Sequence, residues 1–147
     1  MLPEYAAHGV QLPRRASSGS AGYDIAAAAP VTIPPQAVAL VPTGLCVRMP
    51  RDEFLALHVR SGLAVRRGLM LANGTGVVDS DYVGNTENGG HILVALFNWG
   101  RASVRVERGE RIAQGIFVGY RVVDEDQPGH AARVGGFGST GAASLEP

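Results

Sequence analysis

The sequence predicts an all-β protein, a jelly-roll-like sandwich or barrel, on three observations. The 20 Gly and 9 Pro among 147 residues divide the chain into short apolar runs, spaced at roughly ten to fifteen residues. Several runs are rich in β-branched residues or alternate apolar with polar side chains, as half-buried strands do. The alanines at 26–29 would favour a helix, but Pro30 ends that run after four residues.

The expected strands follow one another along the chain, separated by turns rich in Gly, Pro and Asn. The clearest strand is residues 54–59, which follow the turn-like segment 49–52. The other expected strands are residues 38–41, 45–49, 92–98, 102–106 and 116–123. The expected turns are residues 33–35, 73–74, 88–90, 99–100 and 108–109.

Composition excludes several classes of function. All 13 basic residues are Arg, so Schiff-base chemistry and the Walker-type phosphate lysine are excluded. The 13 Asp and Glu balance them, which disfavours a nucleic-acid or membrane-surface protein. No apolar run reaches the roughly 18 residues that span a bilayer, and the lone Cys46 cannot form an internal disulfide. We therefore expect a cytoplasmic protein with one domain and no nucleic-acid or membrane partner.

Residues 124–147 differ in composition from residues 1–123, so we expect a core domain followed by a flexible C-terminal arm. The segment is first acidic and then rich in Gly, Ser and Thr around Arg133 and Phe137, with few apolar side chains to anchor it. Composition alone allows two interpretations. The arm is either a frayed terminus or a flap that wraps a phosphate and stacks on a flat ring.

The common catalytic patterns are missing from the sequence. It has no Walker loop, no zinc-protease motif, no C-x-x-C pair and no nucleophile elbow. The four histidines stand at positions 8, 58, 91 and 130 without the spacing of metal ligands. A metal, if one is used, would therefore have to arrive with the substrate.

Five short clusters pair polar side chains with Gly, and each has an ordinary explanation by itself. Asp24 could cap a turn, Arg60 could lie at a strand end, and Arg111 could be solvated. Asp79 and Asp81 would point to opposite faces if they lay on a strand, so at most one would enter a site. In chain order the clusters are residues 21–25 (AGYDI), 60–64 (RSGLA), 76–82 (GVVDSDY), 109–114 (GERIAQ) and 135–141 (GGFGSTG).

Taken together, these clusters closely resemble the five motifs of the trimeric deoxyuridine triphosphate nucleotidohydrolases, the dUTPases. The match extends from about residue 20 to residue 141, with the motifs in order and at compatible spacing. Residues 96–100 also resemble the strand that precedes the fourth motif of the family. Five motifs in one order are a far more specific signal than any of them alone.

The resemblance implies hydrolysis of dUTP to dUMP and pyrophosphate by in-line attack of water on the α-phosphorus. This reaction keeps uracil out of DNA and supplies dUMP for dTMP synthesis. It requires a base on the water, donors on the leaving pyrophosphate and a pocket for uracil and deoxyribose. The resemblance further implies Mg²⁺ bound through the triphosphate, and a homotrimer with shared sites in which the arm usually reaches another subunit.

The motif positions imply a role for each site residue. Asp79 matches the carboxylate that activates the water, and we assign Asp24 to structural support. Asn73 lies in a β-hairpin, roughly residues 71–78, whose backbone reads uracil, and the Tyr82 ring excludes a ribose 2′-hydroxyl. All these groups are expected to converge on one nucleotide, with Asp79 near Arg60. The implied phosphate-binding residues are Arg60, Ser61, Gly62, Gln114, Arg133, Ser139 and Thr140, and those for uracil and deoxyribose are Asn73, Gly76, Val78, Tyr82 and Phe137.

Three features depart from the family pattern. Val59 stands where Pro is usual, the arm has one residue fewer between Arg133 and the Gly pair, and residues 84–91 form a longer loop. Two other interpretations remain open at this point. A dCTP deaminase of the same fold would need an active-site Glu, which the third cluster lacks, and a non-catalytic nucleotide-binding or regulatory protein would need none of these side chains.

Overall fold

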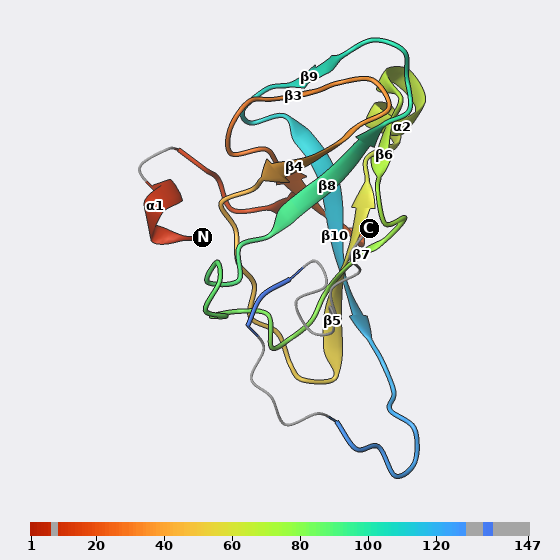
Figure 1. Cartoon of the computed structure of the whole chain (residues 1–147). Coiled ribbons are helices and arrows are strands. Elements are labelled where there is room, and N and C mark those ends of the chain that lie inside the picture. The colour runs from red at the N-terminus through yellow and green to blue at the C-terminus, as the bar shows by residue number, and fades with distance from the viewer. Residues whose placement is uncertain (7–8, 129–133, 137–147) are drawn as a thin grey trace, which may run out of the picture.

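Two long antiparallel strands, β5 and β10, form the spine of the molecule in a computed structural model that describes residues 1–6, 9–128 and 134–136 (Figure 1). Every strand pair within these residues is antiparallel. In chain order the elements are α1 (Pro3–Ala6), β1 (Arg14–Arg15), β2 (Tyr23–Ala26), β3 (Val31–Ile33), β4 (Val38–Pro42), β5 (Glu53–Val59), α2 (Ser61–Arg67), β6 (Leu69–Leu71), β7 (Gly76–Val78), β8 (Leu93–Asn98), β9 (Val104–Val106) and β10 (Arg111–Gly119).

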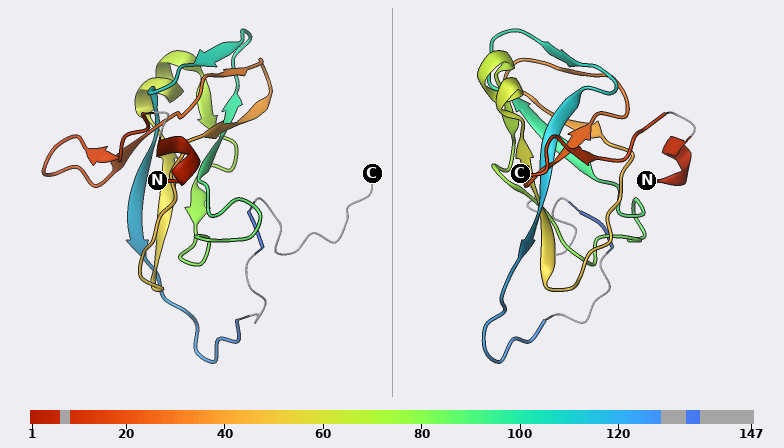
Figure 2. Two further views of the ribbon diagram at one scale, coloured as in Figure 1. Left: turned by 90° about the vertical axis from the view of Figure 1, so that its left-hand side faces the viewer. Right: turned by 180° about the vertical axis from the view of Figure 1, so that it is seen from behind.

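The strands form three sheets. The largest has the order β1-β2-β10-β5-β7, the second has the order β4-β8-β6, and β3 pairs with β9. Figures 1 and 2 show the two larger sheets facing each other, with the β3–β9 ribbon and α2 at one end. The predicted all-β sandwich is therefore confirmed. The longest helix among the described residues, α2, has 7 residues, and no helix in this part of the chain is long and apolar enough to cross a membrane.

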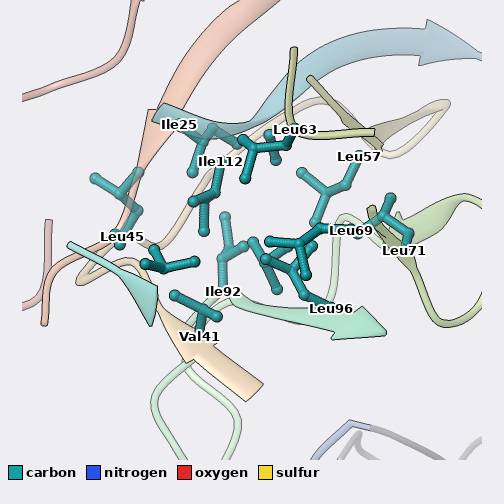
Figure 3. Close-up of a cluster of buried hydrophobic side chains, with 14 of the residues drawn as sticks. Ile25, Val41, Leu45, Leu57, Leu63, Leu69, Leu71, Ile92, Leu96 and Ile112 are labelled. Carbon is teal, nitrogen blue, oxygen red and sulfur yellow. The ribbon is translucent and has the colours of Figure 1, made fainter. Parts of the chain in front are cut away.

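The core lies between the two larger sheets and is made of aliphatic side chains from both (Figure 3). On β8, Val94 and Leu96 point inward and are almost completely buried, while Ala95 and Phe97 remain half-buried. The facing sheet contributes Ile25 and Ile112. Burial of each such side chain stabilises the fold by about 1.5–3 kcal/mol, so alternation along a strand is sufficient to fix which face is inside.

One polar side chain, Asn98, is fully buried at the end of β8. Its Nδ2 donates to the carbonyl oxygens of Ile33 (3.0 Å) and Ala102 (2.8 Å), and its Oδ1 accepts from Gly100 N–H (2.9 Å). These bonds satisfy backbone groups that the sheets leave unpaired. Asn98 therefore ties the β8–β9 turn to the end of β3.

Most of the predicted strands are present, with shifted ends. The run 54–59 lies in β5, 38–41 in β4, 92–98 largely in β8 and 102–106 partly in β9. The strand predicted at 116–123 begins earlier and ends at Gly119.

The strand predicted at 45–49 is wrong, because these residues belong to none of the strands. Gly44 has a left-handed backbone (φ 68°) and packs under the Tyr5 ring, which turns the chain away from the direction of β4.

Helix α2 was not predicted, because its 7 residues are too few to show a helical period. It begins directly after Arg60, buries Leu63 and ends at Gly68. Gly68 adopts a left-handed conformation (φ 64°, ψ 32°) and donates its N–H to the Leu63 carbonyl, the arrangement that commonly closes helices. Two basic residues in the last turn also favour this helix end.

Beyond β10 the chain leaves the sheets. Residues 120–128 project from the body of the molecule in all three views (Figures 1 and 2). Val122 and Val123 are 67% and 75% exposed in this projection. The next described residues, 134–136, lie beside the loop of residues 84–91 (Figure 1).

Candidate active site

A pocket of about 150 Å³ lies where the β6–β7 connection meets Gly136, one of the described arm residues. The wall is formed mainly by β7 and the turn before it, and the floor by apolar side chains of the core. Four residues predicted to hold uracil and deoxyribose line it together. The lining residues are Leu57, Asn73, Gly76, Val77, Val78, Tyr82, Ile92, Leu93 and Gly136.

The pocket wall depends on two glycines. Gly74 has a left-handed backbone (φ 72°) in the turn, and its N–H bonds to the Leu71 carbonyl at 3.1 Å. Gly76 has no positive φ, but a Cβ there would lie 3.0 Å from the Leu57 Cβ. Glycine at 76 therefore lets β7 approach β5 closely enough to pair with it.

The hairpin predicted for residues 71–78 is wrong in its pairing. Leu71 belongs to β6, which pairs with β8, whereas Gly76–Val78 form β7, which pairs with β5. The connection therefore joins the two sheets across the core. Buried side chains on both β6 and β7 explain this arrangement, because each strand covers the core from its own sheet.

Asp79 and Tyr82 lie in the turn that follows β7. The Tyr82 N–H donates to the Asp79 carbonyl at 3.1 Å, so the two residues are held one turn apart. Tyr82 is 7% exposed, Asp79 is half-buried and Asp81 is exposed. Asp79 and Asp81 do not lie on a strand, so the alternation of side chains along a strand does not decide which of them faces the pocket. Asp79 comes between two pocket residues, Val78 and Tyr82, in the chain.

A second cluster is centred on Asp24, at the far end of the large sheet. The Arg60 Nε lies 3.3 Å from one carboxylate oxygen of Asp24, and the Arg111 Nη1 lies 3.1 Å from the other. The Asp24 side chain is only 15% exposed. One carboxylate therefore orients two guanidinium groups, each of which keeps further N–H donors for an anion.

Gln114 completes this second cluster from the middle of the sheet. It stands opposite Asp24 on β2 and opposite His58 on β5, so the three side chains share one face. Gly22 makes room for it, because a Cβ at Gly22 would lie 3.0 Å from the Gln114 Oε1. The exposed Ser61 and Gly62 open α2 immediately after Arg60.

The two clusters lie at opposite ends of β5. Val78 pairs with Leu55, so Asp79 lies beside residue 54, whereas Arg60 follows the other end of the strand. The strand from 54 to 60 spans about 20 Å. Figure 1 shows α2 and the loop after β7 at opposite ends of the molecule. Within one chain the pocket and the Asp24 cluster therefore lie apart, and the structure does not bring Asp79 to Arg60. We name them the pocket half and the phosphate half after the roles predicted for their residues.

The described part of the arm contacts the pocket half. The Glu87 N–H donates to the Val134 carbonyl at 3.0 Å, and Gly135 and Gly136 pack against Glu87 and Tyr82. Four predicted site residues, Arg133, Phe137, Ser139 and Thr140, lie outside the described residues.

Sequence reasoning missed the residues that support Tyr82. The Tyr82 hydroxyl donates to the His91 carbonyl (3.0 Å) and accepts from Asn88 Nδ2 (2.9 Å), while Asn85 Nδ2 donates to the Tyr82 carbonyl (2.8 Å). Asn85 and Asn88, in the Gly-rich segment 84–90, were a readable signal for an ordered loop, because Asn side chains cap turns.

His91 is buried beside this loop and the first helix. Its Nε2 accepts a hydrogen bond from the Gly44 N–H at 3.0 Å, and its ring lies 5.0 Å from the Tyr5 ring. Burial lowers the pKa of His91 below its ordinary value, and the negative charge of Glu4 opposes this only in part. The neutral imidazole is therefore the form that the fold requires.

Within residues 1–6, 9–128 and 134–136, no group of three His, Cys, Asp or Glu side chains is arranged to hold a metal ion. Asp79 and Asp81 stand in the chain between Val78 and Tyr82, two residues that line the pocket. A magnesium ion commonly uses one or two carboxylates and completes its coordination with water and substrate phosphates. The site is therefore compatible with a metal that enters as a metal–triphosphate complex.

Comparison with known proteins gives a consistent result. The family model described as dUTPase matches residues 8–141. The chain is 41% identical over 143 residues to the deoxyuridine 5'-triphosphate nucleotidohydrolase of Lactococcus lactis subsp. lactis, a match that covers 97% of this chain and 95% of that protein.

Two solved structures extend this similarity to three dimensions. The crystal structure of dUTPase from Streptococcus mutans is similar with a TM-score of 0.80 and 37% identity, covering 84% of this chain and 96% of that one. A mutant of Staphylococcus bacteriophage 80alpha dUTPase with dUpNHpp is similar with a TM-score of 0.69 and 25% identity, covering 90% and 93% of the two chains.

Proposed function

Because the chain belongs to the dUTPase family and is a dUTP diphosphatase, we propose that Asp79 activates the water that attacks the α-phosphorus. The observation that carries this assignment is the position of Asp79 between Val78 and Tyr82, two residues of the pocket wall. A carboxylate there can orient a water molecule and accept its proton as the new P–O bond forms. The pyrophosphate then leaves in line with the attacking oxygen.

The pocket is proposed to hold the uracil and the deoxyribose. The buried Tyr82 ring, fixed at its hydroxyl by two hydrogen bonds, would pack under the deoxyribose and exclude a ribose 2′-hydroxyl. Backbone groups beside Asn73, Gly76 and Val78 would read the base edge, which discriminates more strongly than apolar fit. By resemblance, Phe137 would stack on the base.

The second cluster is proposed to bind the phosphates. Arg60, Ser61, Gly62 and Gln114 would contact the α- and β-phosphates, and Asp24 would support Arg60 through the bond seen between them. From the arm, Arg133, Ser139 and Thr140 would reach the γ-phosphate, as the resemblance implies. We place this arm at residues 124–147, after a core domain of residues 1–123.

We infer that the enzyme is a homotrimer in which each site combines halves of different subunits. The support is geometric, because about 20 Å of strand separates Asp79 from Arg60 within one chain, which is too far for one triphosphate group. An apolar groove next to the exposed rings of Tyr23 and Phe117 offers a surface for a second copy. Val122 and Val123, exposed beyond β10, would be covered in the same way.

Mg²⁺ is proposed to enter bound to the triphosphate, without a dedicated metal site in the protein. When bound, the ion would neutralise charge on the phosphate oxygens. The remaining positive charge for the leaving pyrophosphate comes from this chain's arginines. The cytoplasmic location remains a prediction from composition.

The test is a substrate panel with the intact protein and Mg²⁺. We expect pyrophosphate from dUTP, and none from dCTP, dTTP or UTP. Asp79→Asn should abolish turnover and retain binding of a non-hydrolysable dUTP analogue, because the amide preserves the shape of the side chain but accepts no proton. Ammonia release from dCTP would indicate a deaminase, and turnover by the Asp79→Asn variant at the wild-type rate would refute the role of Asp79.

A further inference from the structure

We propose that Asn88 is a positioning residue that fixes the Tyr82 ring and thereby sets the discrimination between deoxyribose and ribose. The inference rests on the proposed function, in which this ring packs under the sugar, and deepens it by naming what holds the ring. Asn88 lies in the loop of residues 84–91, outside the five clusters of the sequence. Three observations carry it: the bonds at the Tyr82 hydroxyl, the bonds that fix Asn88, and the attachment of the loop to the core.

Two hydrogen bonds of the Tyr82 hydroxyl end in this loop. The hydroxyl donates to the His91 carbonyl at 3.0 Å and accepts from Asn88 Nδ2 at 2.9 Å. A phenol oxygen that is held by one acceptor and one donor at these distances has a defined position. Because Tyr82 is buried and lines the pocket, the loop decides how far the ring reaches into the space for the sugar.

Asn88 is itself fixed by the groups around it. Its Oδ1 accepts from the N–H groups of Gly90 (3.0 Å) and His91 (3.2 Å) and from Asn85 Nδ2 (2.9 Å). Three donors require an oxygen at this end of the amide, so the other end, Nδ2, faces the Tyr82 hydroxyl. The direction of the donor toward the ring therefore follows from the bonds that shape the loop.

The end of the loop that accepts the Tyr82 proton is attached to the connection after β4. The His91 Nε2 accepts from the Gly44 N–H at 3.0 Å. The next residue, Ile92, accepts from the Thr43 hydroxyl at 2.6 Å and donates to the Leu45 carbonyl at 2.8 Å. Buried polar networks whose members are satisfied are rigid. The support of the ring is therefore continuous with the core.

Gly90 brings the loop close enough to reach the ring. Its φ is 88°, a conformation that residues with a side chain rarely adopt. A Cβ there would lie 2.6 Å from the Cα of Val83 and 2.9 Å from the Tyr82 carbonyl oxygen. The loop therefore returns directly against the backbone of Tyr82, and this return places Asn88 beside the hydroxyl.

The proposed discrimination depends on how firmly the ring is held. A wall rejects an extra hydroxyl by volume only where the wall cannot yield. A ring that loses one of its two bonds can shift, and the space for a 2′-hydroxyl then opens. Release of the ring should therefore make UTP bind more tightly. General damage to the pocket would have the opposite effect, because it would weaken the binding of both nucleotides.

The test measures the inhibition constant of UTP against dUTP hydrolysis, together with KM for dUTP, using the full-length enzyme and Mg²⁺. In Asn88→Ala the inhibition constant of UTP should fall by about tenfold, the size expected for one net hydrogen bond. KM for dUTP should not fall with it, because deoxyribose gains no contact from the space. An unchanged inhibition constant, or weaker binding of both nucleotides, would overturn the proposal.

Tyr82→Phe provides a second variant that keeps the loop and the ring and removes only the hydroxyl. It releases both bonds, so UTP should bind at least as tightly as it does to Asn88→Ala. The double variant should match Tyr82→Phe within about twofold, because both changes act on one interaction. Additive gains in the double variant, or wild-type discrimination in Tyr82→Phe, would show that the hydroxyl bonds do not position the ring.

Gln36→Asn is the matched control. Gln36 is another amide that bonds to turn carbonyls, those of Trp99 and Gly100, but at the opposite end of β8. Its inhibition constant for UTP should stay within about twofold of wild type, since the ring keeps both bonds. Thermal unfolding of each variant checks that the fold is retained.

Tyr82→Ala separates failure of this inference from failure of the proposed function. If the ring packs under the sugar, its removal relaxes the discrimination whatever holds the ring. Discrimination that survives Tyr82→Ala would refute the pocket assignment and the inference with it. Discrimination that is lost in Tyr82→Ala but kept in Asn88→Ala and Tyr82→Phe would overturn the role of Asn88 alone.

Discussion

Asp79 and Arg60 lie at opposite ends of the same strand, β5, one beside Phe54 and the other just after Val59. In the proposed mechanism the reaction needs both side chains, because a base must act on the water while cations stabilise the leaving pyrophosphate. One chain holds these groups about 20 Å apart. In the homotrimer proposed above, a complete site therefore combines Asp79 of one copy with Arg60 of another.

Two inactive variants should restore each other when mixed. Asp79→Asn destroys the pocket half of a site, and Arg60→Ala destroys the phosphate half. In a mixed oligomer, some sites combine an intact Asp79 from one subunit with an intact Arg60 from another. For equal amounts, about a quarter of the sites are complete, so turnover should rise to about a quarter of the wild-type value.

The control for this mixture is Asp79→Asn combined with a second pocket-half variant, Tyr82→Ala. Both changes damage the same half, so no combination of these chains rebuilds a site. Turnover that stays at background in the first mixture, while mass spectrometry detects mixed oligomers, would show that each site uses one chain only.

Removal of residues 129–147 should leave the fold intact and reduce turnover strongly. The core sheets end at Gly119, and the described arm residues contact the loop and the pocket wall. We expect an unchanged circular dichroism spectrum and a kcat/KM for dUTP lower by about a hundredfold or more, because an open site admits water and loses contacts to the nucleotide. Equal activity in the shortened protein would refute a role for the arm.

Asn98→Leu should destabilise the fold although the two side chains have similar volume. The substitution leaves two carbonyls and one N–H without their partners in a fully buried position. We expect a loss of about 2–4 kcal/mol in the free energy of unfolding, measured by urea denaturation at constant protein concentration.

Gln36 offers a matched comparison for Asn98. It donates to the carbonyls of Trp99 and Gly100 in the same turn, but it is exposed. Gln36→Asn tolerates the positive φ at this position and should cost less than about 1 kcal/mol. A loss as large as that of Asn98→Leu would mean that burial is not the cause.

The fold class and most strands could be predicted because burial alternates along them. β8 is the clearest case, with every second residue buried up to Asn98. The wrong strand prediction at 45–49 arose because one backbone turn outweighed the alternation of apolar and polar side chains. Leu45, Val47 and Met49 alternate like a strand, but the left-handed turn at Gly44 directs them elsewhere. α2 was hidden by its length, although Gly68 and two preceding arginines were a readable end signal.

The site was predictable in its residues more than in its arrangement. Chemistry restricts the residue types, so Asp79, Tyr82, Arg60 and Gln114 could be proposed from motif order. Their separation depends on which strands pair and in what register, and no local pattern encodes that. The role of Asn88 depends in the same way on a contact with Tyr82 that exists only in the folded loop.

His91 should make the stability of the fold depend on pH. Its Nε2 accepts the Gly44 N–H only when the ring is neutral, and burial lowers its pKa below the ordinary 6.5. The unfolded chain therefore binds a proton at a higher pH than the folded one, so stability rises with pH. This contribution is complete above about pH 6.5 and is lost as the pH falls from there through the lowered pKa of the folded state.

His91→Gln keeps an acceptor without titrating, so its urea-unfolding free energy should change less than that of wild type between pH 7.5 and about pH 5. His58→Gln, at an exposed position on β5, should follow wild type, and an identical pH dependence in all three proteins would refute the assignment to His91.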